Sequence, residues 1–355
     1  MSCVCRNTDR IAYLVEDAHP ASEFPADVVL ANCSGMGADR VPPSVAIGLC
    51  TAYRPNMLKA CLEAIAAQQA PADLTIHVVV ADNEPERSNE ALVREFGLRS
   101  GLPVHYIHEP RRGIPQARNA VLAKCRSLGV DWIAFTDDDC RVDRDWVGNL
   151  LQAATRHGAD VIYGRRELVV SDPPPLWSSG SATGGEHSEG DTLRYAATHN
   201  VLLRASLVRG GSAEGLQFDE RLAHGEDTDF FHRAADRGAR IVYSRDPVVF
   251  ETVCPERTTL AYQIRRAYHY AASRSYFHRR YKGWARATKK LVARWVFQVP
   301  LAVVRLLVAP TAWLFSKPTY RTLVLKGMAG LAGALGASAG LFGRDGNPYR
   351  TIDGY

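Results

Sequence analysis

The sequence predicts an α/β fold, with a mostly parallel, Rossmann-like central sheet flanked by helices. Two patterns predict it. Between residues 44 and 256, short apolar runs typical of buried strands alternate with stretches whose apolar residues recur at helical spacing. Polar side chains directly follow several of these runs, most clearly in 132–140, where Trp-Ile-Ala-Phe-Thr leads into Asp-Asp-Asp-Cys. Because open α/β sheets bind ligands beyond the carboxyl ends of their strands, we expect the functional site there.

The first half of this region carries strand and helix signals in strict alternation. Four strands are expected because each is a short apolar run closed by polar or turn-forming residues: 45–51, 76–81, 104–107 and 132–135. Three helices are expected between them: 58 to about 69, 86–96 and 113–125. In the first of these helices, Leu58, Cys61 and Ile65 share one face.

The second half continues the alternation around one long insertion. A helix is expected over 146–154, and another runs through Phe230 and Ala234 to end at Gly238. Strands are expected at 161–170, 199–203 and 241–243. Residues 171–191 are rich in Pro, Ser and Gly, and we expect a loop that covers the substrate.

Composition divides the chain into four parts. Residues 1–43 have mixed charge and no lasting period, which predicts a loosely ordered extension before a catalytic domain at 44–256. From Arg257 onward the chain has 17 Lys and Arg against 2 Asp and Glu, so this part is expected to meet an anionic surface. The eight cysteines form no CxxC pair and predict reduced thiols of a cytosolic domain. No signal peptide is expected at the start.

The basic part has two regions. Residues 257–294 carry eleven Lys and Arg, no acid, and many aromatic residues, and they predict a helical segment. Two apolar stretches at 295–315 and 322–342, within a region of helices and tail at 295–355, are about long enough to cross a bilayer. Because Arg305 and Lys326 would lie inside it, helices in the interface of an anionic cytoplasmic leaflet are favoured over two spans. A soluble helical hairpin is the alternative. Nucleic acid is disfavoured as a partner, since the main domain is acidic.

Asp137, Asp138 and Asp139 predict a metal site. Three adjacent carboxylates repel one another, and oxygen ligands suit Mg²⁺ or Mn²⁺ that shares its coordination with substrate phosphates. A solvated surface turn is the alternative reading of such an acidic run.

Four motifs occur in a fixed order along the chain. They are 112–120 (Arg-Gly-Ile-Pro-Gln-Ala-Arg-Asn-Ala), 136–139 (Thr-Asp-Asp-Asp), 225–231 (Gly-Glu-Asp-Thr-Asp-Phe-Phe) and 250–257 (Phe-Glu-Thr-Val-Cys-Pro-Glu-Arg). Over roughly residues 44–280 the chain resembles the family 2 glycosyltransferases, and most of all their bacterial exopolysaccharide branch of the succinoglycan type. The resemblance implies a GT-A fold with the DXD-type acidic motif at 137–139.

The resemblance also implies a nucleotide-sugar donor, with a UDP-sugar favoured. Eight side chains would bind it: Thr51, Tyr53, Arg54, Asp82, Arg118, Asn119, Asp137 and Asp138. Asp82 would hydrogen-bond the base, and Arg118 and Asn119 would lie near the ribose and diphosphate. Two alternatives remain open, because Asp82 could instead cap the next helix and Arg118 could be a surface residue.

For the reaction, the resemblance implies that Asp139 binds the metal, that Asp227 is the general base, and that Glu226 faces the acceptor. The two acids could instead be ordinary first-turn residues of a helix. The implied enzyme is a metal-dependent, inverting hexosyltransferase on the cytoplasmic face of the cell membrane, with a lipid-linked or polysaccharide acceptor. The QxxRW motif of processive synthases is absent at 263–267, which favours transfer of one sugar. The alternatives are a polyprenyl-phosphate sugar synthase and a non-catalytic nucleotide-sugar-binding protein.

Overall fold

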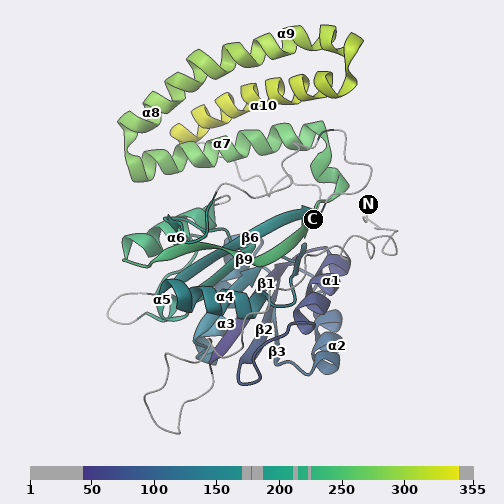
Figure 1. Ribbon diagram of the computed structural model, residues 1–355, viewed down its shortest axis with the longest axis vertical. Coiled ribbons are helices and arrows are strands. Elements are labelled where there is room, and N and C mark those ends of the chain that lie inside the picture. Colours follow the sequence, from purple (N-terminus) through teal and green to yellow (C-terminus); the bar gives the residue numbers. More distant parts are fainter. Residues whose placement is uncertain (1–42, 170–176, 178–186, 211–214, 223–224, 344–355) are drawn as a thin grey trace. The chain divides into compact units, whose positions relative to one another are not determined.

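The fold is described by a computed structural model that covers residues 43–169, 177, 187–210, 215–222 and 225–343. Figure 1 shows these residues as a coloured ribbon. Residues 1–42 of the predicted N-terminal extension, most of the predicted substrate-covering loop and residues 344–355 of the predicted tail lie outside them.

A single mixed sheet forms the centre of the catalytic part. Its strands among the described residues are β1 (Ser44–Thr51), β2 (Thr75–Asp82), β3 (Val104–His108), β4 (Trp132–Thr136), β5 (Cys140–Val142), β6 (Val161–Val169), β7 (Thr192–Leu193), β8 (Asn200–Arg204) and β9 (Ile241–Thr252). Their order is β3-β2-β1-β4-β8-β6-β9-β5, with β7 also paired to β9. Strands β3, β2, β1 and β4 are parallel, whereas β8 runs antiparallel to both β4 and β6. Strands β6 and β9 also pair in parallel. The predicted α/β fold class with a mostly parallel sheet is therefore confirmed.

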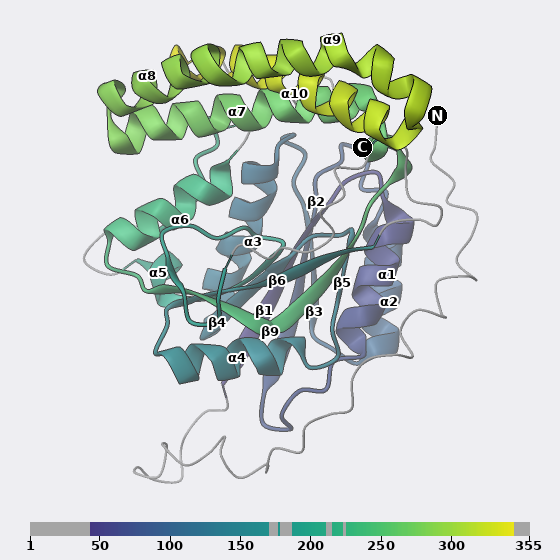
Figure 2. The same ribbon diagram turned by 45° about the horizontal axis from the view of Figure 1, so that its top comes forward.

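Helices cover both faces of the sheet (Figure 2). One face packs against α1 (Pro55–Ala66), α2 (Glu90–Ser100) and α4 (Trp146–His157), and the other against α3 (Ile114–Leu128), α5 (Ser206–Arg209) and α6 (Glu226–Asp236). Successive strand residues point to opposite faces. Val45, Ile47 and Leu49 of β1 therefore enter the first core, and Ala46 enters the second.

Gly48 lets helix α3 approach the sheet closely. A Cβ atom at this position would lie 2.5 Å from Val121 Cγ1 and 2.9 Å from Phe135 Cε1. Any larger residue would push α3 or β4 away, which costs packing energy in a core of ordinary density. The close fit sets the position of α3, whose first turns reach the carboxyl ends of the strands.

Strand β9 is longer than the sequence predicts. The strand expected at 241–243 continues to Thr252 although the segment contains Pro247. Its pairing with β6 jumps from Tyr163↔Tyr243 to Arg165↔Val248, so the intervening residues form an irregularity in the ladder. The Pro247 carbonyl accepts a 2.9 Å hydrogen bond from Asn200 Nδ2. The extension carries Glu251 opposite Cys140, next to the acidic run.

Four helices form a layer beside α6, which we call the helical layer. It consists of α7 (Leu260–Lys282), α8 (Trp284–Ala293), α9 (Val299–Phe315) and α10 (Lys317–Leu341), with a π-helical turn η4 (Arg294–Gln298) between α8 and α9. In both views α7 lies nearest the sheet, and Figure 1 shows α9 on the far side of α10. Arg279 Nη1 of α7 donates to the Leu341 carbonyl of α10 at 2.8 Å, and Trp295 Nε1 donates to Ser338 Oγ at 3.0 Å. The helical segment predicted at 257–294 and the apolar stretches after it are therefore packed together.

Candidate active site

The predicted site residues at the ends of β1 and β4 meet. Thr51, the last residue of β1, donates a 2.9 Å hydrogen bond from Oγ1 to Asp138 Oδ2. Both side chains are buried. Burial raises the pKa of Asp138 to about 7, because the lowering effect of Arg54 does not offset the loss of water and the negative charge of Asp139.

Asp139 is held by two guanidinium groups. Its Oδ2 lies 3.1 Å from Arg54 Nη1 and 3.0 Å from Arg257 Nη1. Arg54 Nη1 also lies 3.3 Å from Asp138 Oδ1. Asp139 is buried at 6% exposure, so these ion pairs offset the cost of keeping its charge out of water.

Next to Asp139, a second carboxylate, Glu251, pairs with Arg257 and with one further arginine. Glu251 of β9 binds Arg257 Nη1 at 3.1 Å through Oε1 and Arg166 Nη1 at 2.7 Å through Oε2. No role was predicted for Arg166 or Arg257 from the sequence. The motif at 250–257 was the signal for Arg257, but only the length of β9 shows that Glu251 and Arg257 reach the acidic run.

Arg118 links the two acidic parts of the site. Its Nη1 donates a short hydrogen bond to Glu226 Oε1, and its Nη2 lies 3.7 Å from Asp137 Oδ1. The guanidinium carbon lies 5.7 Å from the centre of the Phe218 ring. Arg118 is 7% exposed, which excludes the alternative that it is a surface residue.

Asn119 is engaged with the segment that precedes α6. Its Nδ2 donates to the Phe218 carbonyl at 2.9 Å, and its Oδ1 accepts from the Phe218 N–H at 2.8 Å. Both ends of the amide therefore fix Phe218, which supports Arg118. The implied contact of Asn119 with ribose and diphosphate remains a prediction.

Asp82 lies at the end of β2 with its oxygens engaged inside the protein. It accepts hydrogen bonds from the Asn89 N–H at 3.1 Å, from Asn89 Nδ2 at 3.2 Å and from the Tyr106 hydroxyl at 2.9 Å. Asn89 is the N-cap residue of α2, so Asp82 fixes the residue from which this helix begins. Nearby, the buried Glu84 accepts a short hydrogen bond from the N–H of Tyr53, whose ring is exposed. The roles of Asp82 and Tyr53 in nucleotide binding remain predictions.

Glu226 and Asp227 begin helix α6. Burial raises the pKa of Glu226 to about 7, with Arg118 lowering it and the neighbouring Asp227 raising it. Burial also raises the pKa of Asp227, although its Oδ1 accepts a 2.6 Å hydrogen bond from the Thr228 N–H. A carboxyl group whose pKa lies near neutral pH is suited to accept a proton in catalysis.

Helix α7 holds the start of α6 in place. Gly225, the N-cap of α6, has φ +71°, and a Cβ there would lie 2.3 Å from Phe277 Cε2 of α7. The Tyr281 hydroxyl of α7 donates a 2.6 Å hydrogen bond to Oδ1 of the fully buried Asp229. Arg233 Nε donates to the other oxygen of Asp229 at 2.7 Å. The helical layer therefore contributes directly to the position of the acidic pair.

The acidic run offers oxygen atoms suited to a hard cation. The side chain of Asp137 is 42% exposed, and Asp139 Oδ1 has a thiol contact of 3.8 Å from Cys140 Sγ. Among the described residues no group of three or more His, Cys, Asp and Glu could hold a metal by itself. A divalent cation here would therefore depend on phosphate oxygens of a bound nucleotide, as Mg²⁺ commonly does.

His199 is buried, and the loss of water together with Arg166 lowers its pKa to about 3, so it is neutral.

Comparisons with known proteins match the chain to one family. The model of the family described as glycosyl transferase family 2 matches residues 44–210. The succinoglycan biosynthesis protein ExoM of Rhizobium meliloti (strain 1021) is 35% identical over 232 residues, which cover 62% of this chain and 71% of that protein.

The fold is shared with a mannosyltransferase of known structure. The mannosyltransferase PcManGT from Pyrobaculum calidifontis, solved in complex with GDP-Man and Mn²⁺, has a TM-score of 0.53 at 20% identity, covering 82% of this chain and 86% of that one. S. aureus TarS has a TM-score of 0.46 at 18% identity, and the match covers 63% of this chain but only 39% of the TarS chain.

Proposed function

This chain belongs to glycosyl transferase family 2, and we propose that it moves one sugar from a nucleotide-sugar, with a UDP-sugar favoured, to a hydroxyl of a lipid-linked or polysaccharide acceptor. The reaction would invert the anomeric carbon and serve the synthesis of a cell-surface glycan. One observation carries the proposal. Arg118 joins Glu226, the first residue of α6, to Asp137 at the end of β4. The acidic pair of Glu226 and the candidate base Asp227 therefore lies beside the candidate donor site.

Asp227 is the proposed base. As the acceptor oxygen forms its bond to the anomeric carbon, the bond from that carbon to the diphosphate breaks and the hydroxyl proton passes to the Asp227 carboxylate. Displacement with inversion needs only one such carboxylate. Burial raises the pKa of Asp227, which makes the carboxylate more basic. Glu226, held by Arg118, would face the acceptor.

The donor would lie over the ends of β1 and β4. Thr51 and Arg54 fix Asp138 from one side, and Asp137 keeps an exposed carboxylate on the other. Asp139 is the proposed protein ligand for Mg²⁺ or Mn²⁺. When bound, such an ion would stabilise the charge that develops on the leaving diphosphate.

The apolar surface of the helical layer is evidence for an acceptor located at a membrane. Two of its helical segments, 284–315 and α10, are long and apolar enough to cross a membrane by length and composition. Large apolar side chains on η4 and α9 are exposed: Trp295, Val296, Phe297, Leu301, Val303, Val304, Leu307, Val308, Trp313, Leu314 and Phe315. Many large apolar side chains exposed together on a soluble protein mark a site that contacts a partner or a membrane.

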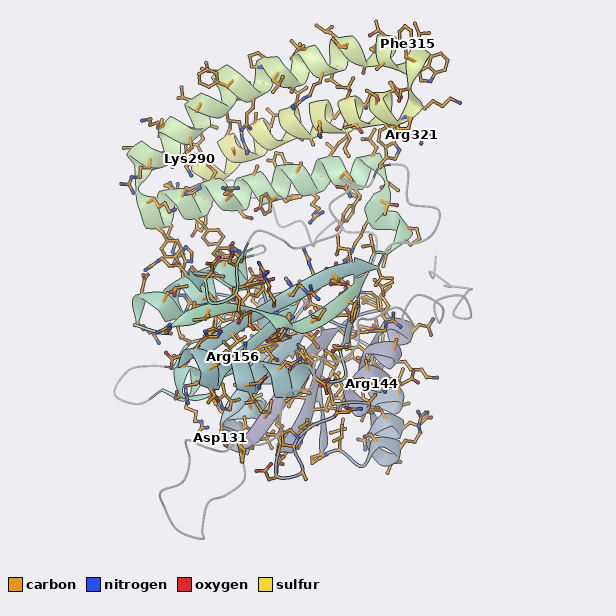
Figure 3. The ribbon with its side chains drawn as sticks, in the orientation of Figure 1. Asp131, Arg144, Arg156, Lys290, Phe315 and Arg321 are labelled. Atoms are coloured by element: carbon orange, nitrogen blue, oxygen red, sulfur yellow. The ribbon has the colours of Figure 1, made fainter. Side chains whose placement is uncertain are left out.

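We propose that this apolar surface lies in the interface of an anionic leaflet, on the cytoplasmic face. Figure 3 shows Lys290 near one end of the helical layer, with Phe315 and Arg321 near the other. Each such basic residue contributes about 1 kcal/mol near an anionic bilayer. An arrangement parallel to the bilayer fits the packing of α10 against α7, because α7 is joined to the catalytic part through Tyr281.

Donor turnover tests the proposal. Purified full-length protein with membrane lipid extract is given a panel of UDP- and GDP-sugars, with Mn²⁺, with Mg²⁺ and with EDTA. We expect one donor to be consumed only when metal is present, and Asp139→Asn to lose that activity. Asp131→Asn is the matched control, because Asp131 is exposed at the amino end of β4 (Figure 3). Two results would contradict the proposal: that none of the donors is consumed, or that a donor is consumed equally fast with EDTA and with metal.

A further inference from the structure

One oxygen atom of the proposed metal ligand is already occupied by two positive groups. Arg54 Nη1 and Arg257 Nη1 lie 3.1 Å and 3.0 Å from Asp139 Oδ2. In the absence of a donor, these guanidinium groups neutralise a carboxylate that is 6% exposed. A divalent cation that binds the same carboxylate would bring a third positive group to within a few ångströms of both arginines, and such groups repel.

The two arginines differ in how they are held. Arg54 contacts Asp138 Oδ1 as well as Asp139 Oδ2, so it is tied to two neighbours in the acidic run. Arg257 is tied to Asp139 and to Glu251 Oε1 at 3.1 Å, and Glu251 lies on a different strand from the acidic run. Arg257 can therefore leave Asp139 while keeping its contact with Glu251. Its side chain is 30% exposed, which leaves solvent on one side for such a movement.

Arg257 belongs to the connection between the sheet and the helical layer. It lies in the 3-10 turn η3 (Pro255–Thr258), which follows β9 and directly precedes α7. This position is outside residues 44–210, which the family model matches. A basic residue from the connection to the helical layer thus completes the charge balance of the catalytic site.

We propose that Arg257 is a displaceable counter-cation of Asp139, so that the protein takes up its divalent metal together with a nucleotide diphosphate and not alone. The inference rests on the proposed function and concerns how its site is assembled. The diphosphate supplies the negative charge that the metal and the two arginines require. Once Asp139 binds metal, the Arg257 guanidinium turns to the phosphate oxygens, for which its planar set of donors is well suited. Arg257 is in this sense a positioning residue for metal and donor.

Binding of Mn²⁺, measured by the electron paramagnetic resonance signal of the free ion, tests the proposal without any turnover. The full-length protein is titrated with Mn²⁺ alone and with Mn²⁺ plus UDP. For Arg257→Met we expect Mn²⁺ alone to bind about tenfold more tightly than to the wild type, because a competing charge-assisted contact is lost. We expect UDP in the presence of Mn²⁺ to bind about tenfold more weakly, because a phosphate contact is lost.

Two further variants keep the result interpretable. Arg265→Met removes the same charge from an exposed position on α7 and should bind both ligands as the wild type does. Arg257→Lys keeps a positive charge at the site, so it should bind Mn²⁺ alone as weakly as the wild type does. This comparison can still be made if Arg257→Met folds poorly.

The proposal predicts that Arg257→Met binds Mn²⁺ alone more tightly but UDP with Mn²⁺ more weakly. General damage to the fold would instead weaken the binding of both ligands. Unchanged or weaker binding of Mn²⁺ alone to Arg257→Met, with the wild type still binding Mn²⁺ and UDP together, would overturn this inference and leave the proposed function intact. A wild type that binds no Mn²⁺ even with UDP would contradict the proposed metal-dependent function, and this inference with it.

Discussion

Replacement of Arg118 by Met removes the positive charge between the two acidic parts of the site. Arg118 donates to Glu226 Oε1 and lies 3.7 Å from Asp137 Oδ1. Glu226 is 5% exposed, and burial already raises its pKa to about 7 despite the lowering effect of Arg118. Without Arg118 the pKa of Glu226 must rise further, and the cost of the change depends on pH.

The magnitude follows from the lost contact. A hydrogen bond to a charged group contributes about 1.5–3 kcal/mol, which corresponds to a pKa about one to two pH units higher. A carboxyl group whose pKa is raised by folding lowers the free energy of unfolding as pH rises from its unfolded value through its folded one. In Arg118→Met this loss continues beyond pH 7. The extra destabilisation from Glu226 should therefore be small at pH 6 and approach about 1.5–3 kcal/mol near pH 9.

Urea denaturation of the full-length protein at pH 6, 7.5 and 9, followed by near-ultraviolet circular dichroism, measures the difference. Arg94→Met is the matched control, because Arg94 is 72% exposed on α2 and pairs with Glu90 four residues away. We expect the control to change stability by less than about 0.5 kcal/mol at every pH. A destabilisation of Arg118→Met that does not grow with pH would refute the reasoning.

Three further predictions concern the acidic pair, the contact between helices and the membrane. The rate of transfer should rise with pH as Asp227 ionises. Glu226→Gln should move that rise to lower pH in a kcat/KM profile, because Arg118 is no longer paired with the Glu226 carboxylate and then lowers the pKa of Asp227 more strongly. Tyr281→Phe should lower the free energy of unfolding by about 1.5–3 kcal/mol, since it removes a 2.6 Å hydrogen bond to a buried carboxylate. In the same denaturation assay Tyr270→Phe, at a 67% exposed position on α7, should cost far less. Lys290→Ala should weaken sedimentation with anionic vesicles about fivefold at low salt and leave neutral vesicles unaffected, and an equal effect on both would exclude the electrostatic account.

The strands and their ends could be predicted from sequence because burial imposes a clear pattern. The apolar runs at 45–51 and 132–135 became β1 and β4, and their ends bring Thr51 and Asp138 together across 87 residues of chain. Strand direction beyond β4 could not be read in the same way. It depends on how the chain crosses the sheet, and β8 runs antiparallel to its neighbours.

Helix boundaries shifted where side chains of the site control the backbone. The helix expected at 86–96 is α2 at Glu90–Ser100, because Asp82 and Glu84 bind Asn89 and hold the preceding residues in a loop. Arg87 in that loop has a positive φ of 52°. The last helix begins before the apolar stretch at 322–342, since Ser316 caps it by accepting from the Thr319 N–H at 3.4 Å.

Contacts between segments that are far apart in the chain could not be predicted from the sequence. Arg118 was predicted near the donor, but its bond to Glu226 requires α3 and α6 to meet across 108 residues. Asn119 was grouped with it by position, whereas the structure engages its amide with Phe218. The contact of Arg257 with Asp139 needs the full length of β9, which the Pro247 segment concealed.

The role of Asp227 as the base is the central claim, and one comparison tests it most directly. Nucleotide binding and sugar transfer are measured in parallel for the wild type and Asp227→Asn, with the donor that the wild type consumes. We predict that the variant binds UDP as the wild type does and transfers sugar about 10²–10⁴-fold more slowly. A variant that transfers sugar at the wild-type rate would contradict the account, and would point to an anionic acceptor such as polyprenyl phosphate, which needs no base.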